Sequence, residues 1–283
     1  MELSTFKNLF KYDPRMVGYV GFEREDFILG ESGKIVPMAY EILSGIDNRG
    51  IFEVGQTGEI WTCPSIPSRW HPVKPGTFAY ELSASQIESR IGPCALKDLR
   101  WKLEEVESLL ILLLKYKRCK PLRVEVGPAN MPLDVYPDPT GRYQKITKNM
   151  PREILLAACR VIGTHVHIGM PDHDTALRVY NHVIRYLAEL CEAGNGSFGE
   201  RLAIYKQMAP NYEPKPYASW DEYYQTALAQ GFAEDPRKCW TLIRISMHGT
   251  IEFRMFGATD SIERIVKWAT RCHELCLEAM TQS

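Results

Sequence analysis

The sequence lacks the features that mark a membrane protein, a zinc protein or a nucleic-acid-binding protein. Its most apolar run, residues 109–114, has six members, whereas a membrane-spanning helix needs about twenty. The 34 basic and 35 acidic residues give a net charge of −1, which argues against nucleic acid or an acidic membrane surface as the partner. None of the eight cysteines forms a CxxC pair, and the HExxH and P-loop signatures are missing.

Repeats, low-complexity tracts and a proline- or glycine-rich linker are missing as well. A length of 283 residues suits one large domain or two small ones, and we predict a single domain over residues 1–283. The scattered cysteines and the absence of an apolar leader segment predict reduced thiols and a cytoplasmic protein. The least regular stretch, residues 128–151, predicts a long loop with a functional role.

Hydrophobic periodicity predicts an α+β protein. Helices are expected at residues 97–118, 174–193, 219–230 and 260–280, and strands at 16–29, 77–82, 122–126, 160–168, 240–247 and 250–256. A tight turn at 247–249 joins the last two strands into an antiparallel hairpin. Because the elements do not alternate as βαβ units, the predicted sheet is mainly antiparallel.

Three of the predicted strands carry pairs of polar residues on one face, since side chains i and i+2 of a strand project together. The paired residues are Glu23 with Glu25, His165 with His167, and Glu252 with Arg254. An ordinary solvent-exposed face of an antiparallel sheet alternates in the same way. The residue types favour a site, because clustered carboxylates need a compensating charge and oxygen-rich ligand sets suit Mg²⁺ or Mn²⁺.

Three further residues, together with Arg254, extend this picture. Glu81 and Glu88 are either surface acids near a strand end or additional metal ligands. Arg244 lies in an apolar strand and Arg254 lies on its hairpin partner. A buried guanidinium is either paired with a carboxylate or used to bind phosphate, whose oxygens match the planar fork of arginine. Metal ions and arginines on one face of a sheet are typical of sites that catalyse phosphoryl transfer.

Three motifs resemble the glutamate–cysteine ligases of the second, bacterial carboxylate–amine ligase group. Residues 21–25 (GFERE) resemble the first metal-binding strand of that family, and residues 163–171 (GTHVHIGMP) resemble its histidine strand and that of glutamine synthetase. Residues 251–254 (IEFR) resemble a strand that both families share. The resemblance extends from about residue 16 to residue 270. It implies a glutamine-synthetase-like catalytic domain, with a curved, mainly antiparallel sheet enclosing the active site and helices packed behind.

The resemblance also implies a role for each matching residue, with ATP and Mg²⁺ or Mn²⁺ as cofactors. Glu25, Glu81 and Glu88 match the ligands of the metal nearer the substrate. Glu23, His165 and Glu252 match the ligands of the metal that bridges the ATP phosphates. Arg254 matches the arginine that steadies the transferring phosphoryl group, and with Glu252 it forms the expected catalytic set. Arg244 matches an arginine that contacts nucleotide phosphate, and His167 matches a contact to substrate or phosphate.

The implied reaction joins a glutamate-like carboxylate to an amine through an acyl phosphate, and the family favours homo-oligomers. The expected partners are these small molecules, without nucleic acid or membrane. Tyr205 and Lys206 follow on a predicted short helix, where they either reach the substrate or form an ordinary helix face. Two alternatives use the same scaffold: a guanidino-kinase-like phosphotransferase, and a non-catalytic nucleotide- or metal-binding homologue.

Overall fold

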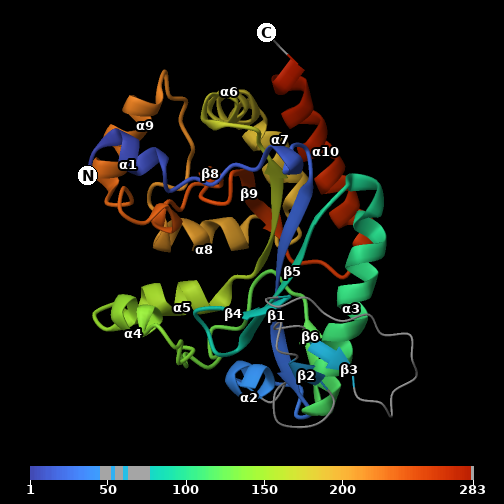
Figure 1. Ribbon diagram of the computed structural model, residues 1–283. Helices are drawn as coiled ribbons and strands as arrows, with labels where there is room; N and C mark the ends of the chain where they lie inside the picture. The colour runs from blue at the N-terminus through green and yellow to red at the C-terminus, as the bar shows by residue number, and fades with distance from the viewer. Residues whose placement is uncertain (45–51, 55–59, 63–76, 282–283) are drawn as a thin grey trace.

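An antiparallel sheet forms the centre of the computed structural model, which describes residues 1–44, 52–54, 60–62 and 77–281 (Figure 1). The strand order is β4-β5-β1-β7-β9-β8, and β6 pairs with the far end of β1. The strands of this sheet are β1 (Val20–Gly30), β4 (Phe78–Tyr80), β5 (Gln86–Cys94), β6 (Cys119–Leu122), β7 (Gly163–Gly169), β8 (Ile243–Ser246) and β9 (Thr250–Gly257). A separate small sheet pairs β2 (Phe52–Val54) with β3 (Ile60–Thr62).

Helices lie on both sides of the sheet. In Figure 1, α3 and α10 stand along one side, and α4, α5 and α8 lie on the other. The helices are α1 (Leu3–Lys7), α2 (Ala39–Ser44), α3 (Leu99–Tyr116), α4 (Arg142–Thr147), α5 (Arg152–Arg160), α6 (His173–Val183), α7 (Leu187–Gly194), α8 (Glu200–Met208), α9 (Trp220–Gln230) and α10 (Ile262–Thr281). None of these described helices is long and apolar enough to cross a membrane.

The alternation of side chains along the strands gives the sheet two unlike faces. Phe22 of β1, Val166 of β7 and Phe253 of β9 are buried in the main core, together with Leu103 of α3 and Ile265 of α10. Burying each such side chain stabilises the fold by about 1.5–3 kcal/mol. Because side chains alternate along a strand, the burial of these residues determines which residues project from the opposite face of the sheet. The opposite face of the same strands carries the charged residues.

The register of the sheet then brings the charged residues into rows. The pairs that lie directly opposite each other are Glu25 with Glu88, Glu23 with His165, His167 with Glu252, and Arg244 with Glu252. Directly opposite residues on one face have neighbouring Cβ atoms, so their side chains interact. Five strands, β5, β1, β7, β9 and β8, thus contribute to one polar surface.

The predicted α+β class with a mainly antiparallel sheet is confirmed, and the sheet is open, with β4 and β8 at its two ends. Helices predicted at 97–118, 219–230 and 260–280 are confirmed as α3, α9 and α10. The predicted helix 174–193 is divided into α6 and α7 by the 3-10 turn Ile184–Tyr186. The seven described cysteines are free, and Cys63 lies outside the described residues.

The strand predicted at 122–126 is wrong, because β6 is Cys119–Leu122. The alternation that suggested a strand has another cause: Arg123 is buried beside Asp26 and Glu107, and Glu125 is buried against a neighbouring loop. The region 128–151 is not entirely loop, since it contains α4. Strand β5 and helices α4 and α5 were missed, and β5 turns out to be a direct neighbour of β1.

Candidate functional site

Three carboxylates form the first ligand group, with one oxygen of each within 4.8 Å of the others. Glu25 comes from β1, Glu88 lies opposite it on β5, and Glu81 follows the end of β4. Burial raises the pKa of Glu25 to about 7. The positive charge of Arg201 acts in the opposite direction, and the negative charge of Glu88 raises the pKa further. Burial and the neighbouring carboxylates hold the pKa of Glu81 well above its usual range. Three ionised carboxylates this close together require a compensating positive charge, such as that of a bound cation.

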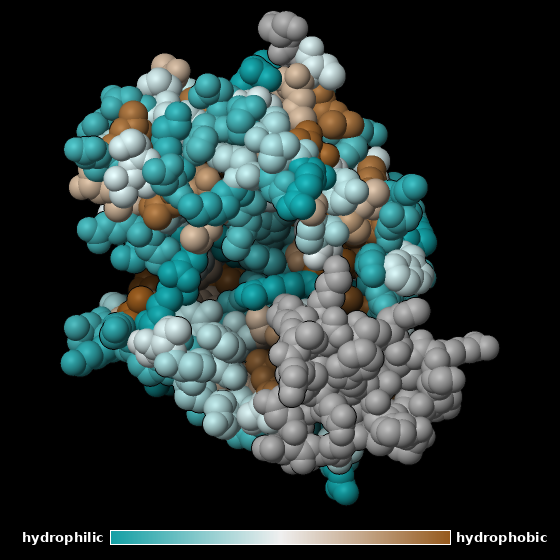
Figure 2. Space-filling view, in the orientation of Figure 1, coloured by the Kyte–Doolittle hydropathy of each residue, from teal (hydrophilic) through white to brown (hydrophobic). Residues whose placement is uncertain are grey.

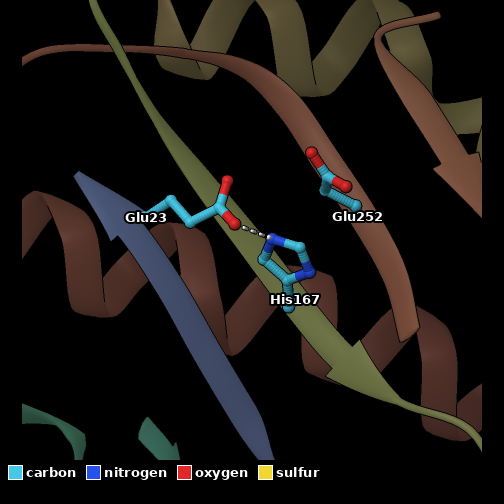
Figure 3. A group of neighbouring side chains, drawn as sticks. All are labelled: Glu23, His167 and Glu252. Atoms are coloured by element: carbon cyan, nitrogen blue, oxygen red, sulfur yellow. Dashed lines mark ion pairs between the residues drawn. The ribbon is translucent and has the colours of Figure 1, made fainter. Parts of the chain in front are cut away.

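Glu23, His167 and Glu252 form the second ligand group, and their side chains point toward one another from β1, β7 and β9 (Figure 3). His167 Nε2 lies 3.6 Å from Glu23 Oε1 and is buried without a hydrogen-bond partner. His167 Nδ1 lies 2.9 Å from Thr250 Oγ1, which orients the ring. A metal-ligating histidine has this arrangement, with one nitrogen free and the other held by a hydrogen bond. The second group thus suits a divalent cation.

His165 lies between the two groups. Its Nδ1 is 3.0 Å from Glu23 Oε2, and its Nε2 is 3.8 Å from Glu25 Oε1. Burial, followed by the nearby Arg254 charge, lowers the pKa of His165 to about 4, so the ring is neutral at neutral pH. The sequence assigned His165 to the second metal, whereas the tighter ligand group contains His167. The structure brings both histidines to the site, and their separate roles stay predictions.

Two arginines hold Glu252 from opposite sides. Arg244 Nε donates a hydrogen bond to Glu252 Oε2 at 2.7 Å, and Arg254 Nη1 donates to Glu252 Oε1. Burial alone would raise the pKa of Glu252, but the charges of Arg244 and Arg254 outweigh it and keep the pKa well below its usual range. The Arg254 guanidinium also lies over the Trp240 ring, 5.6 Å from its centroid. Both arginines are thus paired with a carboxylate and directed into the site.

The five carboxylates of the two ligand groups line one cavity of about 240 Å³. Figure 2 shows the surface hollowed between the part that carries α8 and the part that carries α4 and α5. Tyr205 of α8 lines this cavity and donates its hydroxyl hydrogen to the Trp240 carbonyl at 2.9 Å. Lys206 is exposed and lies over the Tyr212 ring, so the cavity lining contains Tyr205 but not Lys206.

A second cavity of about 300 Å³ adjoins the first. Tyr19 and Pro93 contribute apolar walls, and His167 lines it. The residues that line both cavities are Glu23, Arg90 and His248. The metal-ligand groups are therefore reached from a polar cavity on one side and a mainly apolar one on the other.

Arg201 is a buried site residue that the sequence interpretation missed. The register between β7 and β9 shifts opposite His165, which leaves a bulge at Arg254 and Met255. The Arg201 guanidinium donates hydrogen bonds to the carbonyls of Ile162, Met255 and Arg254 at 2.7, 3.1 and 3.3 Å. A β-bulge leaves backbone groups unpaired, and Arg201 satisfies them, so this side chain fixes the backbone that presents Arg254.

Glycine at position 163 makes room for this guanidinium. A Cβ atom at Gly163 would lie 2.1 Å from Arg201 Nη2 and 2.8 Å from the Phe256 carbonyl oxygen. The Gly163 N–H meanwhile donates a hydrogen bond to Glu25 Oε2 at 2.7 Å. The same backbone segment therefore holds a carboxylate of the first ligand group and receives Arg201.

Glu125 anchors the helix that carries Arg201. Its carboxylate accepts hydrogen bonds from the Gly196 N–H and the Ser197 hydroxyl, both at 2.6 Å. The Ser197 oxygen in turn accepts from the Arg201 N–H at the start of α8, at 3.1 Å. The sequence pattern of residues 122–126 predicted a strand and gave no indication of this anchoring role.

We expect Arg201→Lys to lower kcat by about tenfold to a hundredfold while the protein stays folded. Lysine keeps the charge but lacks the planar fork that reaches three carbonyls, so the bulge shifts and Arg254 is misplaced. Steady-state turnover and the far-UV circular dichroism spectrum would be compared with those of Arg160→Lys. Arg160 also binds a carbonyl, that of Gly127, but lies outside the cavity lining. Equal activities of the two variants would contradict the role given to Arg201.

The fold is similar to that of part of a bifunctional glutathione synthetase from Pasteurella multocida, which aligns with a TM-score of 0.57 at 15% identity. The alignment covers 92% of this chain and 38% of that chain. A glutamine synthetase from Plasmodium falciparum aligns with a TM-score of 0.44 at 12% identity, over 93% of this chain and 51% of that one.

The chain is homologous to proteins named as ligases. The curated relatives are called "Putative glutamate–cysteine ligase 2": that of Gloeobacter violaceus is 27% identical over 226 residues, and that of Leifsonia xyli is 23% identical over 277 residues. These alignments cover 72% and 90% of this chain, and 57% and 65% of the relatives' own length. The relative from Solibacter usitatus is 23% identical, with 54% of its length covered. No family model matches the chain.

Proposed function

We propose that the protein is an ATP-dependent ligase that joins a carboxylate to an amine through an acyl phosphate. The observation that carries the proposal is the pair of ligand groups side by side on one sheet face, next to two arginines that share a carboxylate. The names of the sequence relatives support the same class of reaction.

The donor sets fit two divalent cations. Three carboxylates with raised pKa values accept a hard cation, and the free Nε2 of His167 beside Glu23 completes a mixed oxygen and nitrogen set. Glu25, Glu81 and Glu88 would hold one ion, and Glu23, His167 and Glu252 the other. Bound Mg²⁺ or Mn²⁺ offsets the charge of the nucleotide phosphates and aligns them for in-line transfer.

The apolar cavity suits the base of a nucleotide. Aromatic and proline side chains give flat contact surfaces, and the cavity meets the ligand groups at Glu23, Arg90 and His248. A nucleotide seated there would direct its phosphates toward His167 and the arginines. The polar cavity remains for the acid and the amine.

The arginines then act on the transferring group. Arg254, held between Glu252 and the Trp240 ring, places positive charge beside the phosphoryl group as it passes to the acid. An oxygen of the substrate carboxylate attacks the terminal phosphorus, and ADP departs. The amine next attacks the carbonyl carbon of the acyl phosphate, phosphate departs, and an amide remains. A gamma-glutamyl product results if the acid is glutamate.

ADP release tests the proposal. The protein would be incubated with ATP and Mg²⁺ or Mn²⁺, with amino acids as acids crossed against a panel of amines. We expect ADP release that needs both substrates, with free phosphate formed in equal amount. A stable phosphorylated product without free phosphate would show a phosphotransferase instead, and tight ATP binding without any turnover would show a non-catalytic homologue. The predicted homo-oligomer, single domain and cytoplasmic location stay predictions.

A further inference from the structure

Residues 8–19 form a strap that leads from α1 to the start of β1 and crosses the ends of β7 and β9 on the way (Figure 1). The Lys11 N–H donates to the Met247 carbonyl, in the turn between β8 and β9, at 2.9 Å. Further along the strap, the Gly18 N–H donates to the Gly169 carbonyl at the end of β7, at 3.0 Å. The strap is therefore bound to the end of the sheet that carries the second ligand group.

The contact between the strap and the β8–β9 turn leaves no room for a side chain. Gly249 has a φ of +71°, which favours glycine, and its N–H closes the turn by donating to the Ser246 carbonyl at 3.0 Å. A Cβ atom at Gly249 would collide with the Lys11 carbonyl oxygen and would lie 2.9 Å from the Tyr12 Cα atom. The strap and the turn thus touch through their backbones, so a shift of one displaces the other.

Two residues at this turn connect it to the second ligand group and to the cavities. Thr250 Oγ1 lies 2.9 Å from His167 Nδ1 and orients that ring, while His248 lines both the polar and the apolar cavity. The strap contributes Met16 and Tyr19 to the lining of the apolar cavity, to which Thr250 also belongs. The strap and the turn together therefore build part of the wall of the cavity proposed for the nucleotide.

Aromatic packing anchors the beginning of the strap. Phe10 is buried, and its ring centroid lies 5.1 Å from that of Trp220 at the start of α9. Phe6 of α1 is fully buried, with its ring centroid 5.2 Å from that of Tyr224. Helix α1 has five residues and is too short to be stable without such packing. The place of the strap thus depends on α9, although neither Phe10 nor Trp220 lines either cavity.

We propose that the strap is a positioning element for nucleotide binding, which holds the β8–β9 turn and through it the cavity wall and the His167 ring. The inference rests on the proposed function for the class of ligand, a nucleoside diphosphate or triphosphate bound with Mg²⁺. Phe10 and Lys11 act through the turn and touch no reacting group. Positioning of this kind has a large effect, because a displacement of about 1 Å in a site can cost about a hundredfold in rate.

Two matched pairs of variants test the strap. Gly249→Ala places a Cβ atom against Lys11, whereas Gly33→Ala imposes the same strain at a φ of +74°, with no atom of the described residues within 4 Å. Phe10→Leu loosens the anchor, whereas Phe232→Leu loosens the same hydrophobic core outside the strap. Calorimetry would measure the binding of ADP in the presence of Mg²⁺, and thermal unfolding would measure stability. KM values for ATP, the acid and the amine would come from ADP release.

We expect Gly249→Ala to weaken ADP binding and to raise the KM for ATP by about tenfold, and Phe10→Leu to do both by about threefold. The KM values for the acid and the amine should change by less than about twofold. Gly33→Ala and Phe232→Leu should lose stability but keep the wild-type affinity for ADP.

Equal ADP affinity within either pair of variants would overturn the inference, because strain or a loosened core would then explain every effect. An equal rise in all three KM values, or no binding of ADP by the wild type, would overturn it as well. A wild type that binds ADP, loses affinity in Gly249→Ala and Phe10→Leu alone, and turns over no pair of acid and amine would support the inference while contradicting the proposed function.

Discussion

Without metal ions, the protein should lose stability as the pH rises from 5 to 8, and Glu81→Gln should remove much of that loss. The reason is the first ligand group, where burial and mutual repulsion raise the carboxyl pKa values. A raised pKa means that the folded protein keeps protons that the unfolded chain releases. For Glu25, whose pKa moves from 4.5 to about 7, stability is lost through that window, and the loss amounts to about 3 kcal/mol above pH 7.

Without metal ions at pH 8 we expect the wild type to be less stable than Glu81→Gln, and with Mg²⁺ we expect it to be more stable. A cation that binds only the folded protein stabilises it by mass action, and it displaces the protons that the three carboxylates hold at neutral pH. The midpoint of thermal unfolding would be measured at pH 5, 6, 7 and 8, with Mg²⁺ and with chelator. Wild type should be less stable than Glu81→Gln with chelator at pH 8, and more stable than it with Mg²⁺.

An exposed acid provides the control for this comparison. Glu104 lies on the exposed side of α3, so Glu104→Gln should follow the wild type under all conditions. A wild-type melting temperature that stays flat between pH 5 and pH 8, together with no gain from Glu81→Gln, would show that the three carboxylates do not repel one another. A full Mg²⁺ response in Glu81→Gln would remove Glu81 from the ligand group.

Glu252→Gln should reduce turnover at least about a thousandfold and should also lower stability by about 3 kcal/mol. The catalytic loss follows because this carboxylate belongs to the second ligand group and holds both Arg244 and Arg254. The loss of stability follows because two buried guanidinium groups lose their negative partner. Turnover per folded molecule and the free energy of unfolding in urea would be measured on the same preparation.

A buried ion pair on the opposite face of the sheet separates the two effects. Asp26 is fully buried, pairs with Arg123, and follows Glu25 on β1, where it faces away from the site. Asp26→Asn should destabilise the fold by a similar amount while turnover per folded molecule stays within about twofold. If Asp26→Asn lost as much activity as Glu252→Gln, the effect at Glu252 would be one of folding.

Much of the site could be predicted from strand periodicity, because a period of two fixes which side chains share a face. That rule placed Glu23 with Glu25 and Glu252 with Arg254 before any register was known, and the structure agrees. It could not choose between His165 and His167, since both project to the same side. The choice depends on ring orientation, which the Thr250 hydroxyl sets for His167.

The period of two applies only to strands, so it could not predict which helical residues enter the site. Arg201 enters the site because α8 packs across the end of the β7–β9 pair, and its contacts are to carbonyls that exist only at a bulge. Arg142, which also lines the polar cavity, comes from a stretch predicted as loop, since α4 is short and begins after Gly141. The pairing of β5 with β1 could not be predicted from the sequence either, although it places Glu88 opposite Glu25.

The strand order has a consequence for how the site is made during synthesis. β1 is the earliest strand of the main sheet to leave the ribosome, yet it lies between β5 and β7, which are translated much later. The ligand group of Glu23 can therefore form only after His167 and then Glu252 have been translated. A nascent chain that ends before β9 has Arg244 but lacks both Glu252 and Arg254, so the second ligand group is incomplete. The proposed activity therefore requires that translation has passed the β8–β9 hairpin and that β1 has paired with β7.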